Sequence, residues 1–243
     1  MLPSPGIKFR PEYLDFDKGI RVGNLEDDER ITRLLKLQLE ENFGEPFVTE
    51  RWGRGVYWQW IGFLPRSNRT AKPLSSHVSF GCSKFFLTID REERLFKCGL
   101  QVERGYVKPP SRDKHFTLQK DWDWNRLIRA MKPGSVMEKV LKRLLREGFC
   151  LEVGTWDFDR AKYSGRNIPG MTKLRKFAAA VSGEHWAGLM LYYPMSREEV
   201  LSSTGIDLIE SMMAVFCEVT PVMNLCMQVE LKKRKDFWQN AGG

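Results

Sequence analysis

The chain has 243 residues, a formal net charge of +8, and 42% hydrophobic and 12% aromatic residues. This content of apolar side chains is enough for a core and excludes disorder over most of the length. No apolar run approaches the roughly 18–20 residues of a membrane-spanning helix, and the segment MLPSPGIKF lacks the charged-then-apolar pattern of a signal peptide. Five cysteines without metal-ligand spacing indicate free thiols in a reducing compartment. We therefore expect a soluble, cytoplasmic protein without a membrane partner.

The first part of the chain predicts an arm followed by a helix. Residues 1–24 mix prolines, glycines and both signs of charge, which is typical of a loosely ordered arm that holds at most a short strand. Apolar residues then recur at helical spacing over 31–43, and Gly44 is expected to end that helix. Asn24 or Asp27 is the expected N-cap, because acidic residues follow in what would be the first turn.

The centre of the chain predicts three consecutive strands, over 56–64, 77–89 and 95–103. All three are rich in β-branched and aromatic residues, which suit a pleated, partly buried surface. Strict alternation along the first strand places Trp58 and Trp60 on the same side. Both sides of that strand are apolar enough to be covered, so it is expected to be a central strand or to leave an aromatic surface open.

The second and third strands predict a hairpin with a defined register. If Ile89 faces Phe96, one face of the hairpin becomes apolar and the other mostly polar, as a one-sided antiparallel sheet requires. A slip by one residue would destroy this separation. The expected pairs are Leu87 with Cys98, Phe85 with Leu100, Thr88 with Lys97 and Lys84 with Gln101.

Basic residues gather in the two segments that follow the first and third strands, at 65–73 and 105–120. Successive connections of a meander alternate between the two ends of the sheet, so these two segments are expected at the same end. Lysine and arginine side chains bind phosphates, and an aromatic ring among them can stack on a base. The predicted anion-binding residues, called the basic rim below, are Arg66, Arg69, Lys72, Arg104, Tyr106, Lys108, Arg112 and Lys114.

The remaining elements alternate between helix and strand, and a segment at 230–243 is expected to be a frayed basic tail. Ser135 and the capping box Ser196-Arg-Glu-Glu199 mark two helix starts, and Pro221 is expected to kink or split the last helix. The expected elements are helices over 121–131 or 123–131, 135–147, 170–181, 196–204 and 206–219, the last with a continuation beyond Pro221 to 229 as an alternative, and strands over 149–155 and 186–193.

Strands and helices in this segregated order favour an α+β architecture. We expect one domain over 1–243, in which helices pack on an antiparallel β-meander sheet of about five strands.

The sequence contains no recognisable catalytic, metal or cofactor motif. Phosphate-loop, dinucleotide, zinc-protease and nucleophile-elbow patterns are absent, and none of the three histidines has a spaced ligand partner. We therefore expect no cofactor and no metal. Asp90, Glu103 and Glu152 lie in or near strands, but none is followed two residues later by the lysine of common nucleases.

These observations favour a non-catalytic binding module that binds an anionic partner through the basic rim. DNA or RNA is the first candidate for this partner. Two alternatives remain open. One is a metal-dependent, nuclease-like enzyme that processes nucleic acid at Asp90, Glu103 or Glu152. The other is an interaction module whose aromatic sheet face binds a protein partner or a second copy of the chain.

Overall fold

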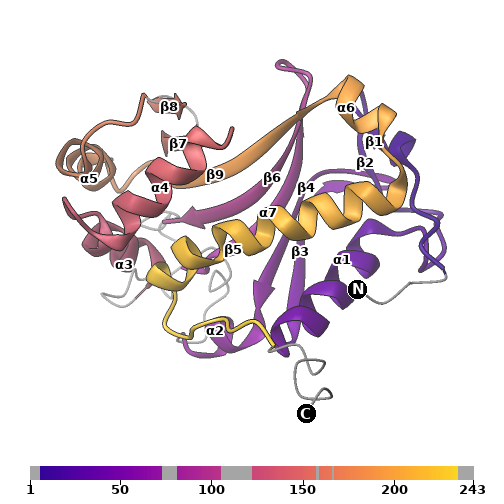
Figure 1. Ribbon diagram of the computed structural model, residues 1–243, viewed down its shortest axis with the longest axis horizontal. Coiled ribbons are helices and arrows are strands. Elements are labelled where there is room, and N and C mark those ends of the chain that lie inside the picture. The colour runs from indigo at the N-terminus through magenta and orange to yellow at the C-terminus, as the bar shows by residue number, and fades with distance from the viewer. Residues whose placement is uncertain (1–5, 73–80, 105–121, 157–158, 166, 235–243) are drawn as a thin grey trace, which may run out of the picture.

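A single antiparallel sheet forms the centre of the protein in the computed structural model, which describes residues 6–72, 81–104, 122–156, 159–165 and 167–234 (Figure 1). Within these residues the sheet has nine strands in the order β1-β2-β4-β5-β6-β9-β7-β8, and β3 pairs with β4 beside this path. The strands are β1 (Leu14–Asp15), β2 (Gly19–Arg21), β3 (Phe47–Arg54), β4 (Tyr57–Pro65), β5 (Lys84–Asp90), β6 (Leu95–Glu103), β7 (Cys150–Thr155), β8 (Arg160–Ser164) and β9 (Ala187–Ser196).

Seven α-helices in the described residues accompany this sheet. They are α1 (Ile31–Phe43), α2 (Arg66–Thr70), α3 (Asp123–Ala130), α4 (Val136–Arg146), α5 (Met171–Ala180), α6 (Arg197–Ser202) and α7 (Gly205–Cys226). The helix α7 crosses one face of the sheet, with α1 on one side of it and α3 and α4 on the other (Figure 1). The predicted one-domain α+β architecture is confirmed, although the sheet has more strands than expected. None of the helices in the described residues is both long and apolar enough to cross a membrane.

Aromatic side chains join α7 to the sheet. Phe216 of α7 stacks on Phe85 of β5 with ring centroids 4.8 Å apart, and Phe63 of β4 lies 6.4 Å from Phe216. All three are completely buried. Burial of such large rings stabilises the fold, because the favourable free energy scales with the apolar area removed from water.

The hairpin of β5 and β6 has the predicted register. Ile89 pairs with Phe96, Leu87 with Cys98, Phe85 with Leu100, Thr88 with Lys97 and Lys84 with Gln101. The apolar members of this ladder face α7. The opposite face carries the charged and polar members, and it is largely buried as well.

A bulge in β4 separates two tryptophans that were expected on one side. Trp52 of β3 pairs with Trp60, whereas the next residue, Gly53, pairs with Trp58, so Gln59 has no partner on β3. The extra residue reverses the alternation. Trp58 packs against the main core on the α7 side, and Trp60 joins a small cluster on the opposite face. The prediction for Trp58 was therefore wrong, because a strict period of two cannot show a bulge.

The structure decides or corrects the sequence-based expectation at three further places. Residues 7–22, expected to be a loose arm, hold β1 and β2, and Ile20 is completely buried. Residues 66–70, expected to be loop, form α2. The helix α7 runs without a break through Pro221 to Cys226, which agrees with the alternative of a continued helix and not with a split at the proline. Burial explains the strand at Ile20 and the continuous helix around Pro221, since most helical and strand stability comes from packing.

All five cysteines are free thiols, as predicted. Cys82, Cys98, Cys150 and Cys226 are buried, and burial raises the pKa of each thiol, to about 12 for Cys82. Cys217 is half-buried. Because the thiolate is the reactive form, we expect Ellman's reagent at pH 8 to label about one thiol quickly in the native protein and the others only in guanidinium. Rapid labelling of several thiols without denaturant would contradict this burial.

Candidate anion-binding cleft

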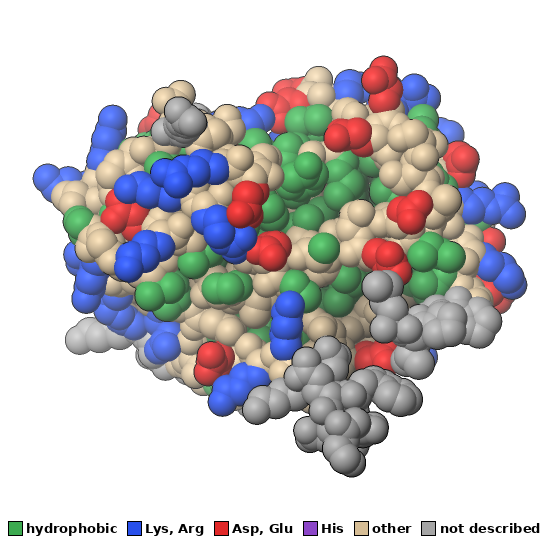
Figure 2. All heavy atoms as spheres, in the orientation of Figure 1, with side chains coloured by type: hydrophobic (Ala, Val, Ile, Leu, Met, Phe, Trp, Pro, Cys, Tyr) green, Lys and Arg blue, Asp and Glu red, His purple; other side chains and the backbone are tan. Residues whose placement is uncertain are grey.

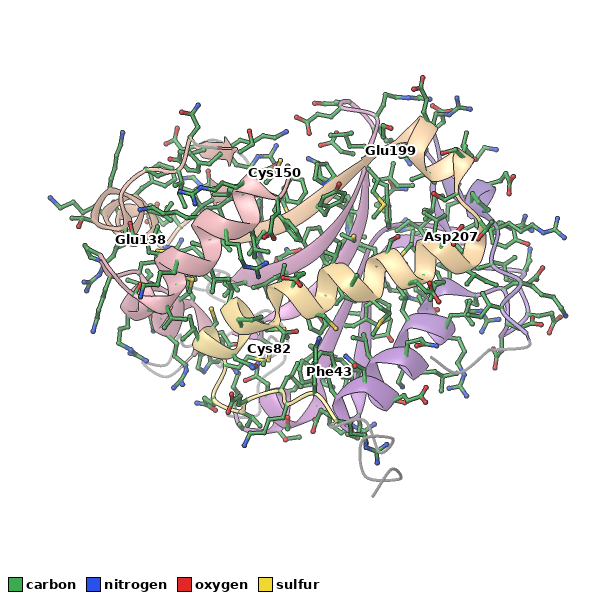
Figure 3. All side chains as sticks on the ribbon, in the orientation of Figure 1. Phe43, Cys82, Glu138, Cys150, Glu199 and Asp207 are labelled. Atoms are coloured by element: carbon green, nitrogen blue, oxygen red, sulfur yellow. The ribbon has the colours of Figure 1, made fainter. Side chains whose placement is uncertain are left out.

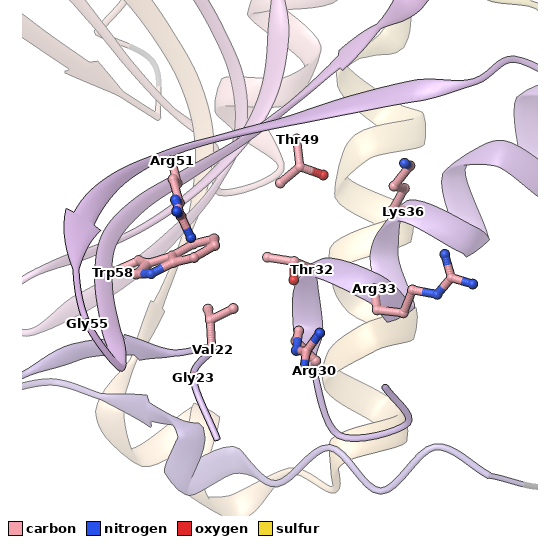
Figure 4. Close-up of a pocket in the computed structure, with 10 residues that line it drawn as sticks. All are labelled: Val22, Gly23, Arg30, Thr32, Arg33, Lys36, Thr49, Arg51, Gly55 and Trp58. Carbon is pink, nitrogen blue, oxygen red and sulfur yellow. The ribbon is translucent and has the colours of Figure 1, made fainter. Parts of the chain in front are cut away.

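A cleft of about 580 Å³ lies between the first turns of α1 and the hairpin of β3 and β4 (Figure 4). Its floor is the segment after β2, where the amides of Val22 and Gly23 donate to the carbonyl of Val56 at 2.8 and 3.0 Å. These two bonds tie the floor to the hairpin tip. We call this site the basic cleft, because its lining includes four cationic residues: Arg30, Arg33, Lys36 and Arg51.

None of the described residues that line the basic cleft is acidic. Two described carboxylates that do not line the cleft form ion pairs with its cations. Asp27 lies 3.3 Å from Arg30 and 3.7 Å from Arg33, and Glu40 lies 3.8 Å from Lys36. These are long, partly exposed ion pairs, which are worth about 0–1 kcal/mol each. The cleft therefore concentrates positive charge that an incoming anion can use.

Arg51 is held in place by an aromatic ring rather than by a carboxylate. Its guanidinium carbon lies 4.3 Å from the centroid of the Trp58 ring, a cation–π contact. Trp58 itself packs against the main core, so the β4 bulge has placed a rigid support under this arginine. No ion pair involving Arg51 occurs in the part of the chain that the structure describes. Its hydrogen-bond donors are thus not committed to a carboxylate.

The N-terminus of α1 opens on the same cleft without a capping side chain. The N-cap residue is Arg30 and the first turn contains no acidic residue, so the prediction of Asn24 or Asp27 as the cap was wrong. Residues 26–29 instead form a turn before the helix, in which the amide of Arg30 donates to the carbonyl of Glu26 at 3.0 Å. The positive end of the helix dipole therefore lacks the internal negative charge that the sequence had suggested.

The helices α4, α6 and α7 have acidic residues in their first turns, whereas α2 and α5 resemble α1 in having none. Figure 3 shows Glu138, Glu199 and Asp207 at the N-termini of α4, α6 and α7. The pKa of Glu138 is lowered by Lys142 and by the Gly134 amide, and hydrogen bonds with the N-cap residues lower the pKa of Glu199 and Asp207. By comparison, the first turn of α1 remains available to an external anion.

Only part of the predicted basic rim lies in the described residues. Arg66 and Arg69 are exposed on α2, and the meander brings the ends of β4 and β6 to one end of the sheet, as expected. Tyr106, Lys108, Arg112 and Lys114 lie outside the described residues.

The other two members of the basic rim are buried. Lys72 is 4% exposed, and its ammonium lies 2.7 Å from Asp123 on α3 and 2.8 Å from the side-chain oxygen of Asn68. Arg104 is 5% exposed and donates to the carbonyls of Val181 and His185, both at 2.6 Å. Burial lowers the pKa of Arg104. Both side chains therefore hold the structure together in this conformation and do not present their charge to solvent.

The strand carboxylates lie on the face of the sheet opposite α7, where each contacts a lysine. Glu103 lies 2.7 Å from Lys84, which is completely buried, and both Asp90 and Glu152 contact Lys97 at 2.8 and 3.3 Å. Among the described residues, no three histidine, cysteine, aspartate or glutamate side chains are grouped in a way that could hold a metal ion. These contacts give the acids a structural role as partners of buried lysines.

Aromatic residues on that same face are mostly covered. Trp60 lies across Gly62, where an added Cβ would meet the ring at 2.3 Å, and its Nε1 donates to Gln101 at 2.7 Å. Tyr192 is completely buried, whereas Trp52 on the edge strand β3 is 71% exposed. In the described residues this face therefore offers a satisfied internal network and one isolated exposed tryptophan.

The chain matches no protein-family model, and no curated protein matches it in sequence. The basic cleft is therefore argued from its own chemistry. One sequence signal could have indicated part of it: Arg30, Arg33 and Lys36 recur every three residues, which places them on neighbouring positions of one helix face. Nothing in the sequence pairs them with Arg51, because the β3–β4 hairpin and its bulge were not predicted.

Proposed function

We propose that the protein is a non-catalytic binding module for an anionic partner, nucleic acid first, and that the basic cleft is its principal binding site. The observation that carries this proposal is the convergence of four cations from two separate elements on one concave site, whose described lining residues include no acid. Cations on opposite walls of a cleft repel one another, and a bound polyanion relieves that repulsion. The net charge of +8 adds long-range attraction for the same partner.

Exposed cations elsewhere on the protein provide a matched control. Figure 2 shows Lys and Arg side chains gathered at the end of the molecule that carries α4 and α5. Lys139, Arg146 and Lys173 are exposed there and take part in no ion pair within the described residues. Reversing them changes the net charge as much as reversing three cleft residues does, without touching the cleft.

We expect the triple variant Arg33→Glu, Lys36→Glu, Arg51→Glu to lose most of its affinity for labelled DNA and RNA. Fluorescence anisotropy at several salt concentrations would measure this loss. For a single strand, the slope of log K against log[salt] should become shallower by about 2 if three phosphate contacts disappear. The control variant Lys139→Glu, Arg146→Glu, Lys173→Glu should keep most of the slope.

Two results would contradict the proposal. If the control variant loses as much affinity as the cleft variant, binding depends on net charge and not on a site. If the wild-type protein binds neither DNA nor RNA at low salt, the nucleic-acid proposal is wrong. A further variant, Arg66→Glu, Arg69→Glu, tests the contribution of the basic rim separately from that of the cleft.

A further inference from the structure

We infer that the basic cleft recognises a terminal phosphate or polyphosphate group, whether this belongs to a free nucleotide or to the end of a nucleic-acid strand. This inference rests on the proposed function, since it names the part of the anionic partner that enters the cleft. It depends on three features of the site: the supported guanidinium of Arg51, the unpartnered hydroxyl of Thr32, and positive charge on both walls.

The first feature is the way in which Trp58 holds Arg51. One face of the indole is covered by the guanidinium at 4.3 Å, and the ring also packs against the core. Trp58 therefore supports an arginine and is not an open platform for a base. A planar guanidinium in a fixed position presents paired N–H groups, whose geometry matches two oxygens of a phosphate.

The second feature is a hydroxyl at the start of α1. Thr32 lines the cleft and is 9% exposed (Figure 4). No hydrogen bond of its side chain occurs within the described part of the chain, and its oxygen is not one of the buried unpaired polar atoms there, so solvent reaches it. A phosphate oxygen at the first turn of α1 would give this hydroxyl an acceptor, next to main-chain amides and the positive end of the helix dipole.

The third feature is the placement of positive charge on two walls of the cleft. Arg30, Arg33 and Lys36 come from the α1 wall and Arg51 from the hairpin wall, while the Val56 carbonyl ties the floor to the hairpin. A terminal phosphate carries nearly two negative charges at pH 7 and exposes three oxygens, so it can contact both walls at once. An internal phosphodiester carries one charge, and its chain must leave the site in two directions. The cleft therefore favours the chain end.

The test compares labelled single strands of one sequence with a 5′-phosphate or a 5′-hydroxyl, at matched ionic strength. We expect the phosphorylated strand to bind at least about tenfold more tightly. This preference should disappear in Arg51→Gln and fall several-fold in Thr32→Val, which removes the hydroxyl and keeps the shape. The matched control is Arg54→Gln, since Arg54 is exposed on the same strand and does not line the cleft.

The preference should also weaken as the pH falls through about 6, because the phosphomonoester then loses its second charge. The charged groups that face the site are Arg30, Arg33 and Lys36 on the α1 wall, Arg51 on β3, and Asp27 and Glu40 at its edge. The phosphomonoester itself titrates near pH 6. The 5′-hydroxyl strand lacks this group and is therefore the control for the pH dependence.

A second measurement separates this inference from the proposed function. Inorganic pyrophosphate and a nucleoside triphosphate should raise the thermal midpoint of the wild-type protein and not that of Arg51→Gln, with sodium chloride at equal ionic strength as the blank. Equal binding of the 5′-phosphate and 5′-hydroxyl strands, without any thermal shift, would overturn the inference while leaving nucleic-acid binding intact. A thermal shift that depends on Arg51, without binding of any strand, would support a free nucleotide and overturn the nucleic-acid proposal.

Discussion

Replacing Lys72 with methionine is expected to lower the free energy of unfolding by about 3–5 kcal/mol. The Lys72 ammonium lies 2.7 Å from the Asp123 carboxylate, and both side chains have 0% exposure. Methionine fills a similar volume but leaves the carboxylate buried without its counter-ion. The hydrogen bonds that Asp123 accepts from Asn68 at 2.8 Å and from the Ser83 amide at 2.5 Å do not replace a full positive charge.

Urea unfolding followed by circular dichroism would measure this loss, and a second variant separates the ion pair from packing. In Lys72→Met with Asp123→Asn, the uncompensated charge is gone, so we expect the double variant to be more stable than Lys72→Met alone. A loss below about 1 kcal/mol in the single variant would show that the pair contributes little. The cluster also joins α2 to the segment after α7, since the Gln228 amide contacts Asn68 at 3.4 Å.

Replacing Lys97 with methionine is expected to cost about 3 kcal/mol at pH 7, at the lower end of the range for a broken buried pair. The Lys97 ammonium is 3% exposed and lies within 3.3 Å of three carboxylates, those of Asp90, Glu93 and Glu152. Burial acts to lower the pKa of Lys97, but its hydrogen bonds to Asp90 and Glu93 and the charge of Glu152 outweigh burial and raise it. Asp90 and Glu93 are partly exposed, which limits the loss when their partner is removed.

The effect of this substitution should depend on pH. Burial acts to raise the pKa of Asp90, but hydrogen bonds from the Glu93 amide and from Lys97 lower it overall, and Lys162 and Lys97 lower the pKa of Glu93. A carboxyl whose folded pKa is below its unfolded value of about 4 stabilises the protein above that pH. This stabilisation is lost as the pH falls through the folded pKa. The difference between wild type and Lys97→Met should therefore shrink between pH 7 and pH 3.

Urea unfolding at pH 7, 5 and 3 would measure this difference. The matched control is Lys162→Met, whose ammonium contacts Glu93 at 2.5 Å but whose side chain is 41% exposed, so we expect a loss below about 1 kcal/mol. If the gap between wild type and Lys97→Met stays constant over this pH range, the substitution acts through packing and not through charge.

The sequence predicted the elements that rest on local rules. The β5–β6 register follows from the alternation of apolar and polar residues alone. The side chain of Ser135 caps its helix as expected, by accepting a hydrogen bond from the Glu138 amide at 3.3 Å. The capping box of Ser196 and Glu199 is likewise formed. Such signals depend on residues a few positions apart, so a single sequence is enough to detect them.

The binding residues were harder to predict, because exposure and convergence depend on residues far apart in the chain. In the sequence, Lys72 is one of several basic residues in a polar segment, whereas in the structure α3 places Asp123 against it. Arg51 likewise lies in a polar stretch of the sequence, and only the β4 bulge places Trp58 beneath it. In both cases the sequence pattern gives the charge of the side chain but not the residue that it contacts.

Composition and short-range patterns therefore predict the α+β class, the central hairpin, most helix positions, the free cysteines and the excess of positive charge. These properties follow from residue types and from periods of two and 3.6 residues, which can be detected within a single short segment. Which cations are buried in ion pairs, and which line one cleft, becomes visible only in the folded protein. That outcome depends on a bulge, a helix start and long-range packing, whose free energies are set only when distant segments meet.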